Sequence, residues 1–143
     1  MAVRPSREVE SPRSMPESTA ITEGIRVDVI SNYLPEQSAP EERRWVFVYQ
    51  ITILNRSART VQLISREWRI TNAHGTVERV RGAGVVGQQP VLRPSEGFQY
   101  VSSCPLDTAF GSMEGSYQMV DDAGVPFEVA IAAFALADPM TLN

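Results

Sequence analysis

Hydrophobic and polar residues alternate along much of this chain. In residues 25–31 (IRVDVIS) the apolar side chains fall at every second position with Arg26 and Asp28 between them, which is typical of a strand with one buried face. Residues 44–55 (RWVFVYQITILN) repeat this pattern over a longer stretch, and several residues of the second face are also apolar. This distribution predicts a strand near the centre of a sheet.

Five further segments have strand character and are separated by turn sequences. They are residues 60–71, 76–81, 97–103, 115–120 and 125–134. The sequences NAHG (72–75) and DDAG (121–124) predict hairpin turns, and residues 104–115, with two glycines and a proline, predict a long irregular connection. The sequence therefore predicts an all-β fold, an immunoglobulin-like or fibronectin type III-like sandwich of about seven to eight strands.

The first 20 residues differ in composition from the rest, being rich in Pro, Ser, Arg and Glu and poor in large apolar residues. Residues 1–20 are thus expected to form a disordered tail, and residues 21–143 a single sandwich domain. The N-terminus lacks the apolar segment of a secretory signal, and the longest nearly uncharged apolar run, residues 129–137, is too short to span a bilayer. We expect a cytoplasmic protein without membrane contact.

Charge is unevenly distributed along the chain. All 13 basic residues are arginine; nine lie in residues 43–93 beside only two acids, whereas residues 94–143 contain seven acids and no basic residue. This asymmetry indicates either an anion site on one surface or strands that interleave so that their charges pair, and we favour the second interpretation. The net charge of −4 and the lack of a basic helix argue against a nucleic-acid partner.

Residues 81–90 (RGAGVVGQQP) contain the spacing G-x-G-x-x-G at Gly82, Gly84 and Gly87. In dinucleotide-binding proteins a helix opens at the third glycine, and its N-terminal N–H groups meet the phosphate. Here Pro90 and Pro94 follow closely, and proline breaks a helix. The sequence therefore argues against a dinucleotide-binding fold.

Two interpretations of the glycine loop remain. Successive glycine N–H groups can form an anion-binding concavity without a helix, with Arg79, Arg81 or Arg93 as nearby cations. Alternatively, the glycines permit a sharp turn between the two sheets, which we favour. Phosphate binding at Gly82, Gly84 and Gly87 with Arg79 and Arg81 is kept as the alternative function.

Residues for catalysis are few. His74, the only histidine, lies in the predicted NAHG turn, and Cys104, the only cysteine, lies in the expected connection. A nucleophile needs a base beside it, and no pattern brings these two residues together. We predict no catalytic residues and no enzymatic activity. The single cysteine also excludes an intramolecular disulfide.

Carboxylates near the second hairpin offer the best candidate for a metal site. Asp121 and Asp122 could bind a hard cation such as magnesium, with Asp107 or Glu114 supplying further oxygen ligands. However, Asp-Asp-Ala-Gly is also the sequence that a hairpin turn requires. We predict no metal site and no cofactor, and retain direct cation binding as the alternative.

Phe110 and Met113 differ from the other large apolar residues because they lie in the expected connection. Apolar residues in a long loop either fold back onto the core or contact a partner. Both alternatives stay open, so these two residues are candidates for binding a partner.

Three long motifs resemble the ApaG family. They are G-x-G-V-V-G-x-x-P (82–90), L-x-P-x-E-x-F-x-Y-x-S (92–102) and G-S-M-x-G-x-Y-x-M (111–119). The resemblance is close over residues 67–136 and extends weakly back to about Thr22. Ser95 departs from the family, which usually has glycine there; a side chain makes that turn less permissive but affects no proposed site.

This resemblance implies a fibronectin type III-type sandwich with no agreed enzymatic activity. Bacterial members are associated with cobalt resistance and magnesium efflux, and similar domains in eukaryotic F-box and polymerase-interacting proteins look like protein-interaction modules. The nucleotide or pyrophosphate proposal for the family's glycine loop carries over to Gly82, Gly84 and Gly87. We thus expect a binding module for an unidentified protein partner, with a homodimer or a phosphate-containing ligand as alternatives.

Overall fold

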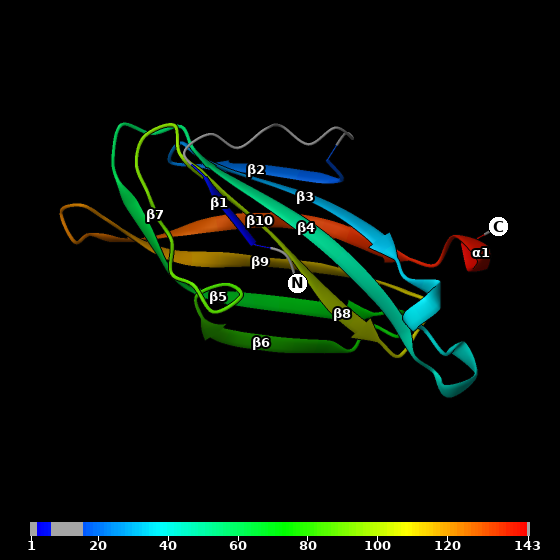
Figure 1. Ribbon diagram of the computed structural model, residues 1–143. Helices are drawn as coiled ribbons and strands as arrows, with labels where there is room; N and C mark the ends of the chain where they lie inside the picture. Colours follow the sequence, from blue (N-terminus) through cyan, green and yellow to red (C-terminus); the bar gives the residue numbers. More distant parts are fainter. Residues whose placement is uncertain (1–2, 7–15, 143) are drawn as a thin grey trace.

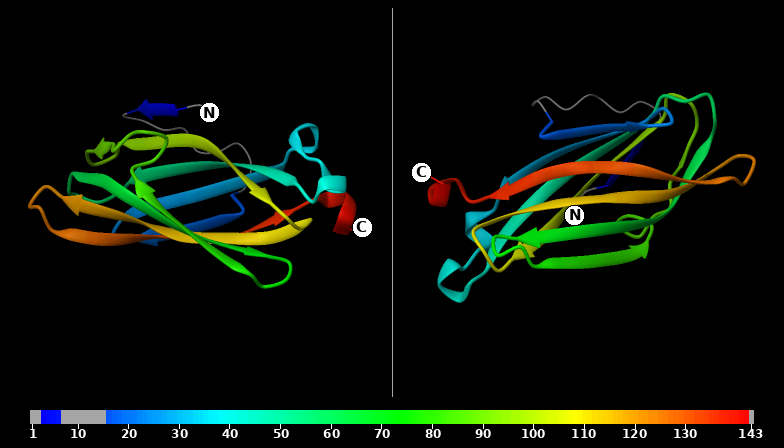
Figure 2. Two further views of the ribbon diagram at one scale, coloured as in Figure 1. Left: turned by 90° about the horizontal axis from the view of Figure 1, so that it is seen from below. Right: turned by 180° about the vertical axis from the view of Figure 1, so that it is seen from behind.

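The computed structural model describes residues 3–6 and 16–142, which form two facing antiparallel sheets (Figures 1 and 2). The first sheet has the order β1 (Val3–Ser6), β8 (Gly97–Leu106), β4 (Trp45–Asn55), β3 (Ile25–Tyr33) and β2 (Ser18–Thr22). The second has the order β10 (Pro126–Ala137), β9 (Phe110–Asp121), β5 (Val61–Asn72) and β6 (Val77–Ala83), and the short β7 (Val91–Leu92) also pairs with β5. Single helical turns occur at Pro35–Gln37, Pro40–Glu42 and α1 (Pro139–Leu142).

The predicted all-β sandwich is confirmed. The seven expected strands correspond to β3, β4, β5, β6, β8, β9 and β10, and the structure adds β1, β2 and β7. No helix in the described part of the chain is long and apolar enough to cross a membrane.

The first sheet includes residues that precede residue 21, the expected boundary between tail and domain. Ser18–Thr22 form β2 and pair with β3, and Val3–Ser6 pair with β8. The polar sequence STAIT was not recognised as a strand because β2 lies at a sheet edge, where even Ile21 is exposed. The remainder of the expected tail, residues 1–2 and 7–15, lies outside the described residues.

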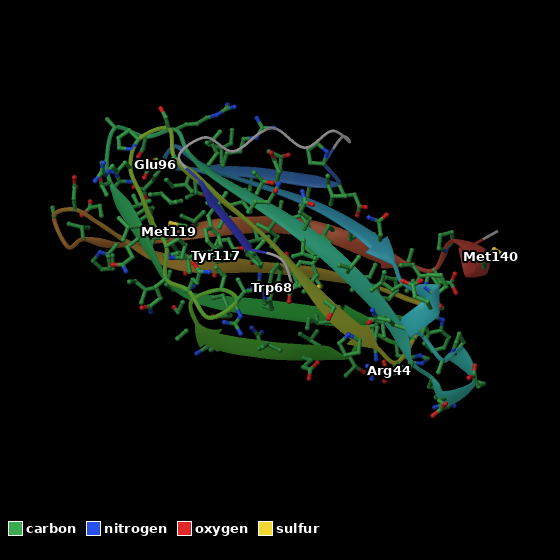
Figure 3. All side chains as sticks on the ribbon, viewed as in Figure 1. Arg44, Trp68, Glu96, Tyr117, Met119 and Met140 are labelled. Atoms are coloured by element: carbon green, nitrogen blue, oxygen red, sulfur yellow. The ribbon has the colours of Figure 1, made fainter. Side chains whose placement is uncertain are left out.

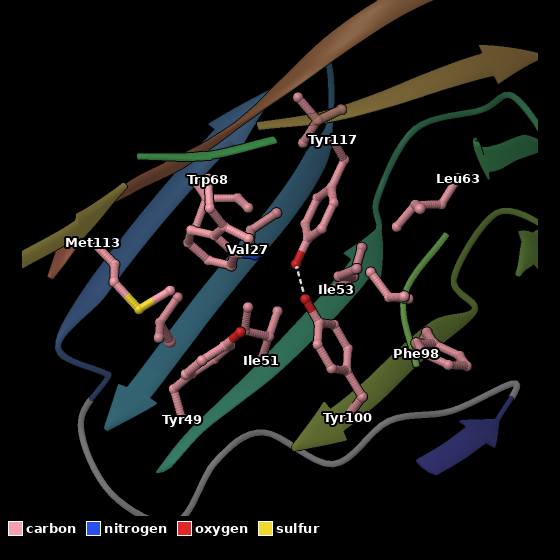
Figure 4. Close-up of a cluster of buried hydrophobic side chains, with 14 of the residues drawn as sticks. Val27, Tyr49, Ile51, Ile53, Leu63, Trp68, Phe98, Tyr100, Met113 and Tyr117 are labelled. Atoms are coloured by element: carbon pink, nitrogen blue, oxygen red, sulfur yellow. Dashed lines mark hydrogen bonds between the residues drawn. The ribbon is translucent and has the colours of Figure 1, made fainter. Parts of the chain in front are cut away.

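The core lies between the sheets and follows the alternation of the sequence (Figure 4). In β4 the inward positions Phe47, Tyr49, Ile51 and Ile53 are all buried. Tyr117 and Met119 of β9 face them from the second sheet, whereas Arg44 and Met140 lie at one end of the sandwich (Figure 3). The rings of Trp68 and Phe134 meet edge to face with centroids 6.0 Å apart, a favourable aromatic geometry.

The prediction of a long irregular connection at residues 104–115 is wrong. Strand β8 continues to Leu106 and β9 begins at Phe110, so only a short turn separates them. The glycines of this segment have a different cause: a Cβ on Gly115 would lie 2.1 Å from the Glu67 carbonyl oxygen of the adjacent β5. Gly115 therefore permits a close approach of two strands and does not mark a loop.

Candidate functional site

The glycine loop connects β6 to β7 through a tight two-residue turn. Val85 and Gln88 exchange both backbone hydrogen bonds at 2.8 Å, and the residues between them have positive φ, 43° at Val86 and 79° at Gly87. This is the geometry of a type I′ turn. The Gly84 N–H donates to the Ile64 carbonyl at 2.8 Å, which fixes the turn to β5.

Each glycine of the G-x-G-x-x-G spacing serves a separate steric purpose. A Cβ on Gly84 would lie 2.2 Å from the Gln88 carbonyl oxygen, and one on Gly82 would lie 2.9 Å from the guanidinium carbon of Arg66. Gly87 has open space around it but a φ of +79°. The spacing is thus accounted for by the turn and by the packing around it.

Several N–H groups of the loop form backbone hydrogen bonds that stabilise the turn, in agreement with the interpretation that the glycines permit a sharp turn. Those of Gly84, Val85 and Gln88 donate to backbone carbonyls. Within the described chain, the N–H groups of Val86 and Gly87 form no such bond. The two central residues of the turn, Val86 and Gly87, therefore offer an anion two backbone donors, whereas the other N–H groups of residues 84–88 serve the turn itself.

The side chains of Arg79 and Arg81 do not point toward the glycine loop. They lie on the outer face of β6, where both approach Glu67 of β5, with N–O distances of 3.9 Å from Arg79 and 3.3 Å from Arg81. Alternation along a strand places Gly82 on the opposite, inner face. The structure therefore brings Gly82 and Gly84 close to a different arginine, Arg66, which the sequence analysis did not single out.

Arg66 points inward because β5 contains a bulge. The pairing of β5 with β9 shifts register between Leu63 and Ser65, so that Arg66 pairs with Tyr117 and shares the inner face with Trp68 and Ile70. One extra residue in a strand reverses the face of every residue after it. The signal is visible in the sequence, since the inward apolar residues of β5 are odd-numbered before the bulge and even-numbered after it.

The Arg66 guanidinium is held by the glycine loop. Its Nη1 donates to the carbonyl oxygens of Ala83 at 3.0 Å and Gly84 at 2.8 Å. A guanidinium has five N–H donors, and no hydrogen bond joins those on Nε and Nη2 to any residue that the structure describes. No carboxylate of the described residues forms an ion pair with Arg66 either.

A cavity of about 220 Å³ lies beside this arginine, between β5, β8 and the loop. Besides Arg66, its lining consists of Tyr49, Trp68, Ala83, Val85, Val86, Gly87, Tyr100 and Ser102. Burial raises the pKa of the Tyr49 and Tyr100 hydroxyls, an effect that the Ser102 side chain near Tyr49, the hydrogen bond of Tyr100 with Tyr117 and the charge of Arg66 partly offset. Both phenols are therefore neutral at physiological pH and able to donate hydrogen bonds.

A second, wider cleft of about 670 Å³ lies at the end of the sandwich where the β5–β6 hairpin meets the end of β8. Its lining is mixed, with the charged residues Glu42, Arg43, Arg44, Glu78 and Asp107 beside apolar residues that include Ile70, Val77 and Leu106. The cleft thus adjoins the beginning of β6.

Cys104 and His74, the two residues considered for catalysis, lie in different surroundings. Cys104 is buried on β8, and burial, with a smaller contribution from Glu78, raises the pKa of its thiol to about 11. A thiol with this pKa is protonated at neutral pH and a poor nucleophile. His74 is exposed in the hairpin turn, where its backbone N–H donates to Asn72 Oδ1.

Three of the four carboxylates considered for a metal site, Asp121, Asp107 and Glu114, have other partners among the described residues. Asp121 Oδ1 accepts hydrogen bonds from the Ala123 and Val125 N–H groups, and Oδ2 pairs with Arg59 Nη1 at 3.0 Å. Asp107 accepts a hydrogen bond from Asn72, and Glu114 approaches Arg69. Among the described residues no three His, Cys, Asp or Glu side chains are grouped as metal ligands.

Phe110 and Met113 have different surroundings. Met113 is 1% exposed and belongs to the core (Figure 4), so it is not available to a partner as the partner-binding hypothesis required. Phe110, at the start of β9, is 45% exposed. Phe110 alone stays a candidate contact.

The strand order and the packed inter-sheet core define a small β-sandwich protein of the fibronectin type III-like class. The model of the ApaG domain matches residues 35–121, and the chain belongs to this family. Protein ApaG of Brucella canis is 54% identical over 128 residues, which cover 87% of this chain and 98% of the relative, and Protein ApaG of Brucella anthropi is 57% identical over 127 residues with the same coverage. The crystal structure of an ApaA protein from Bordetella pertussis is 50% identical with a TM-score of 0.78, covering 80% of this chain and 94% of that one.

Proposed function

We propose that this chain acts by binding an extended, acidic segment of another protein along the outer edge of β6. Strand β6 ends the sheet order β10-β9-β5-β6 and pairs with β5 on one side only (Figure 1). Its other edge forms no backbone hydrogen bond with the described residues. An open strand edge can accept an additional strand from a partner, with main-chain hydrogen bonds providing affinity.

The side chains of β6 favour an acidic partner. Arg79 and Arg81 are 61% and 74% exposed and share one acid, Glu67, so this face carries surplus positive charge. Acidic residues at alternate positions of an added strand would lie beside these two arginines. A second copy of the chain is a poorer occupant, because antiparallel pairing of two β6 edges would place four arginines on one face.

The proposal includes a non-enzymatic mode of action. It is supported by the protonated state of Cys104 and by the structural bonds already made by Asp121. The same proposal includes the cytoplasmic location expected from the sequence and the association with cobalt resistance and magnesium efflux that the ApaG resemblance implies. In that setting the chain would act through its protein partner.

Two short peptides test the edge directly. One alternates valine and glutamate, and its control has lysine in place of glutamate. We expect the acidic peptide to shift the amide NMR signals of residues 77–83 and to slow their hydrogen exchange, with no effect from the lysine peptide. The double variant Arg79→Glu, Arg81→Glu should abolish the effect, whereas Arg56→Glu, an exposed arginine distant in sequence, should preserve it.

Two outcomes would overturn the proposal. One is a failure of the acidic peptide to bind, and the other is slowed exchange at a strand other than β6. Self-association through β6, seen as a concentration-dependent mass in sedimentation, would replace the acidic partner by a homodimer.

A further inference from the structure

We infer that the cavity beside Arg66 is a binding site for one small oxyanion, a phosphate or carboxylate group, with Arg66 as its cationic ligand. This site lies on the inner side of the sheet and is separate from the outer edge of β6. It also differs from an anion cradle made by the glycine N–H groups with Arg79 and Arg81, since the cation and the face of the sheet are both different.

Arg66 carries a positive charge that has no counter-charge among the described residues. Its side chain is half-buried, its Nη1 is fixed by two carbonyl oxygens, and no described carboxylate pairs with it. Carbonyl groups leave the positive charge uncompensated, and a partly desolvated charge is costly without a counter-charge. The Nε and Nη2 donors, which form no hydrogen bond with the described residues, have the fork geometry that binds two oxygens of one carboxylate or phosphate group.

The cavity beside Arg66 is lined by further polar residues. Tyr49 and Ser102, which carry hydroxyl groups, line the same space as Arg66, as do Val86 and Gly87. A positively charged fork with neutral hydroxyl donors around one small space is complementary to a single oxyanion. The indole of Trp68 and the ring of Tyr100 complete the walls.

The volume limits the ligand. Cavities for drug-sized ligands have about 300–1,000 Å³, and this cavity has about 220 Å³. A nucleotide is therefore too large to be enclosed, whereas one phosphate ion or one carboxylate group fits.

Gly82 makes the guanidinium position possible and provides a sharp test. A Cβ at this residue would lie 2.9 Å from Cζ, Nη1 and Nη2 of Arg66, and those atoms form the far end of a flexible side chain. Gly82→Ala should therefore displace the guanidinium while leaving its charge and the strand in place, since φ at Gly82 is not in the left-handed region. This variant tests whether binding requires the guanidinium at its observed position, and not only a positive charge at residue 66.

The experiment is an NMR titration of the Arg66 Nε–Hε signal in labelled protein, with inorganic phosphate in one arm and acetate in the other, at constant ionic strength. We expect saturable shifts of this signal and of the Val86 and Gly87 amides, and the arm that saturates at lower concentration identifies the anion. Arg66→Gln should abolish saturation, Gly82→Ala should weaken binding about tenfold, and Arg81→Gln should bind like the wild type.

Linear shifts in both arms, or unchanged binding by Gly82→Ala, would overturn the inference. If Arg66→Gln does not fold, Gly82→Ala and the Arg66 signal itself still decide the question. Because the peptide test of β6 uses Arg79 and Arg81, failure of one proposal leaves the other unaffected.

Discussion

The hydroxyl groups of Tyr100 and Tyr117 share a buried hydrogen bond that joins the two sheets across the core (Figure 4). Tyr100 comes from β8 and Tyr117 from β9, so the bond links one strand of each sheet. Tyr117 is fully buried and Tyr100 is 3% exposed. A polar pair at this depth is stable only because each hydroxyl satisfies the other.

We expect Tyr117→Phe to lower the free energy of unfolding by about 1–3 kcal/mol, because the Tyr100 hydroxyl loses its buried partner. The double variant Tyr100→Phe, Tyr117→Phe should be destabilised less than the sum of the two single variants, since no unsatisfied hydroxyl is left. Urea unfolding of the four proteins measures the difference. Strict additivity would show that the two hydroxyls do not depend on each other.

The glycine loop gives a prediction about relative stability. Gly87→Ala should cost about 1 kcal/mol, because its φ is positive but its surroundings are open. Gly84→Ala should cost more, because a positive φ combines with a Cβ placed 2.2 Å from the Gln88 carbonyl oxygen. Thermal unfolding of the two variants compares these costs directly. Equal losses would mean that the turn relaxes freely around residue 84.

Much of the fold could be predicted from the sequence because period-two patterns and turn residues act locally. The strands β3, β4 and β10 and both hairpin turns follow directly from such patterns. The extension of β8 and β9 into residues 104–115 could not be predicted from the sequence. Gly115 is typical of a loop, and its role becomes clear only from the close approach of β5. Strand β2 was missed because its polar sequence suits an edge.

The candidate site was harder to predict than the fold. The spacing of Gly82 and Gly84 stands out in the sequence, but the arginine that lies beside them is Arg66, more than a dozen residues earlier in the chain. Its inward direction depends on the bulge after Leu63 and on the pairing of β5 with β6. Nearness in sequence favoured Arg79 and Arg81, whereas alternation directs them to the outer face.

Burial of Cys104 predicts a low reactivity. Since its pKa is raised to about 11, the native protein should react slowly with a thiol reagent at mildly alkaline pH. The rate should rise sharply in urea, where the thiol becomes exposed. As a control, Ala58→Cys in a Cys104→Ser background places a thiol at an exposed position and should react at once in the native state. Rapid labelling of native Cys104 would contradict its burial.

Asp121 makes the stability of the protein depend on pH. Hydrogen bonds from the Val125 and Ala123 N–H groups and the pairing with Arg59 hold the pKa of this carboxyl below its ordinary value of 3.8. A carboxyl with a lowered pKa in the folded state stabilises the protein above its unfolded pKa, and this contribution is lost as the pH falls through the folded pKa. Asparagine at this position keeps an acceptor oxygen but cannot ionise.

The stability difference between the wild type and Asp121→Asn should therefore be largest near neutral pH and shrink on acidification below 3.8. Urea unfolding of both proteins over a series of pH values measures it. In an Arg59→Gln background the difference at neutral pH should be smaller, because one source of the lowered pKa is gone. A difference that stays constant with pH would mean that Asp121 contributes only as a hydrogen-bond acceptor, because ionisation of its carboxylate would then add nothing to folding.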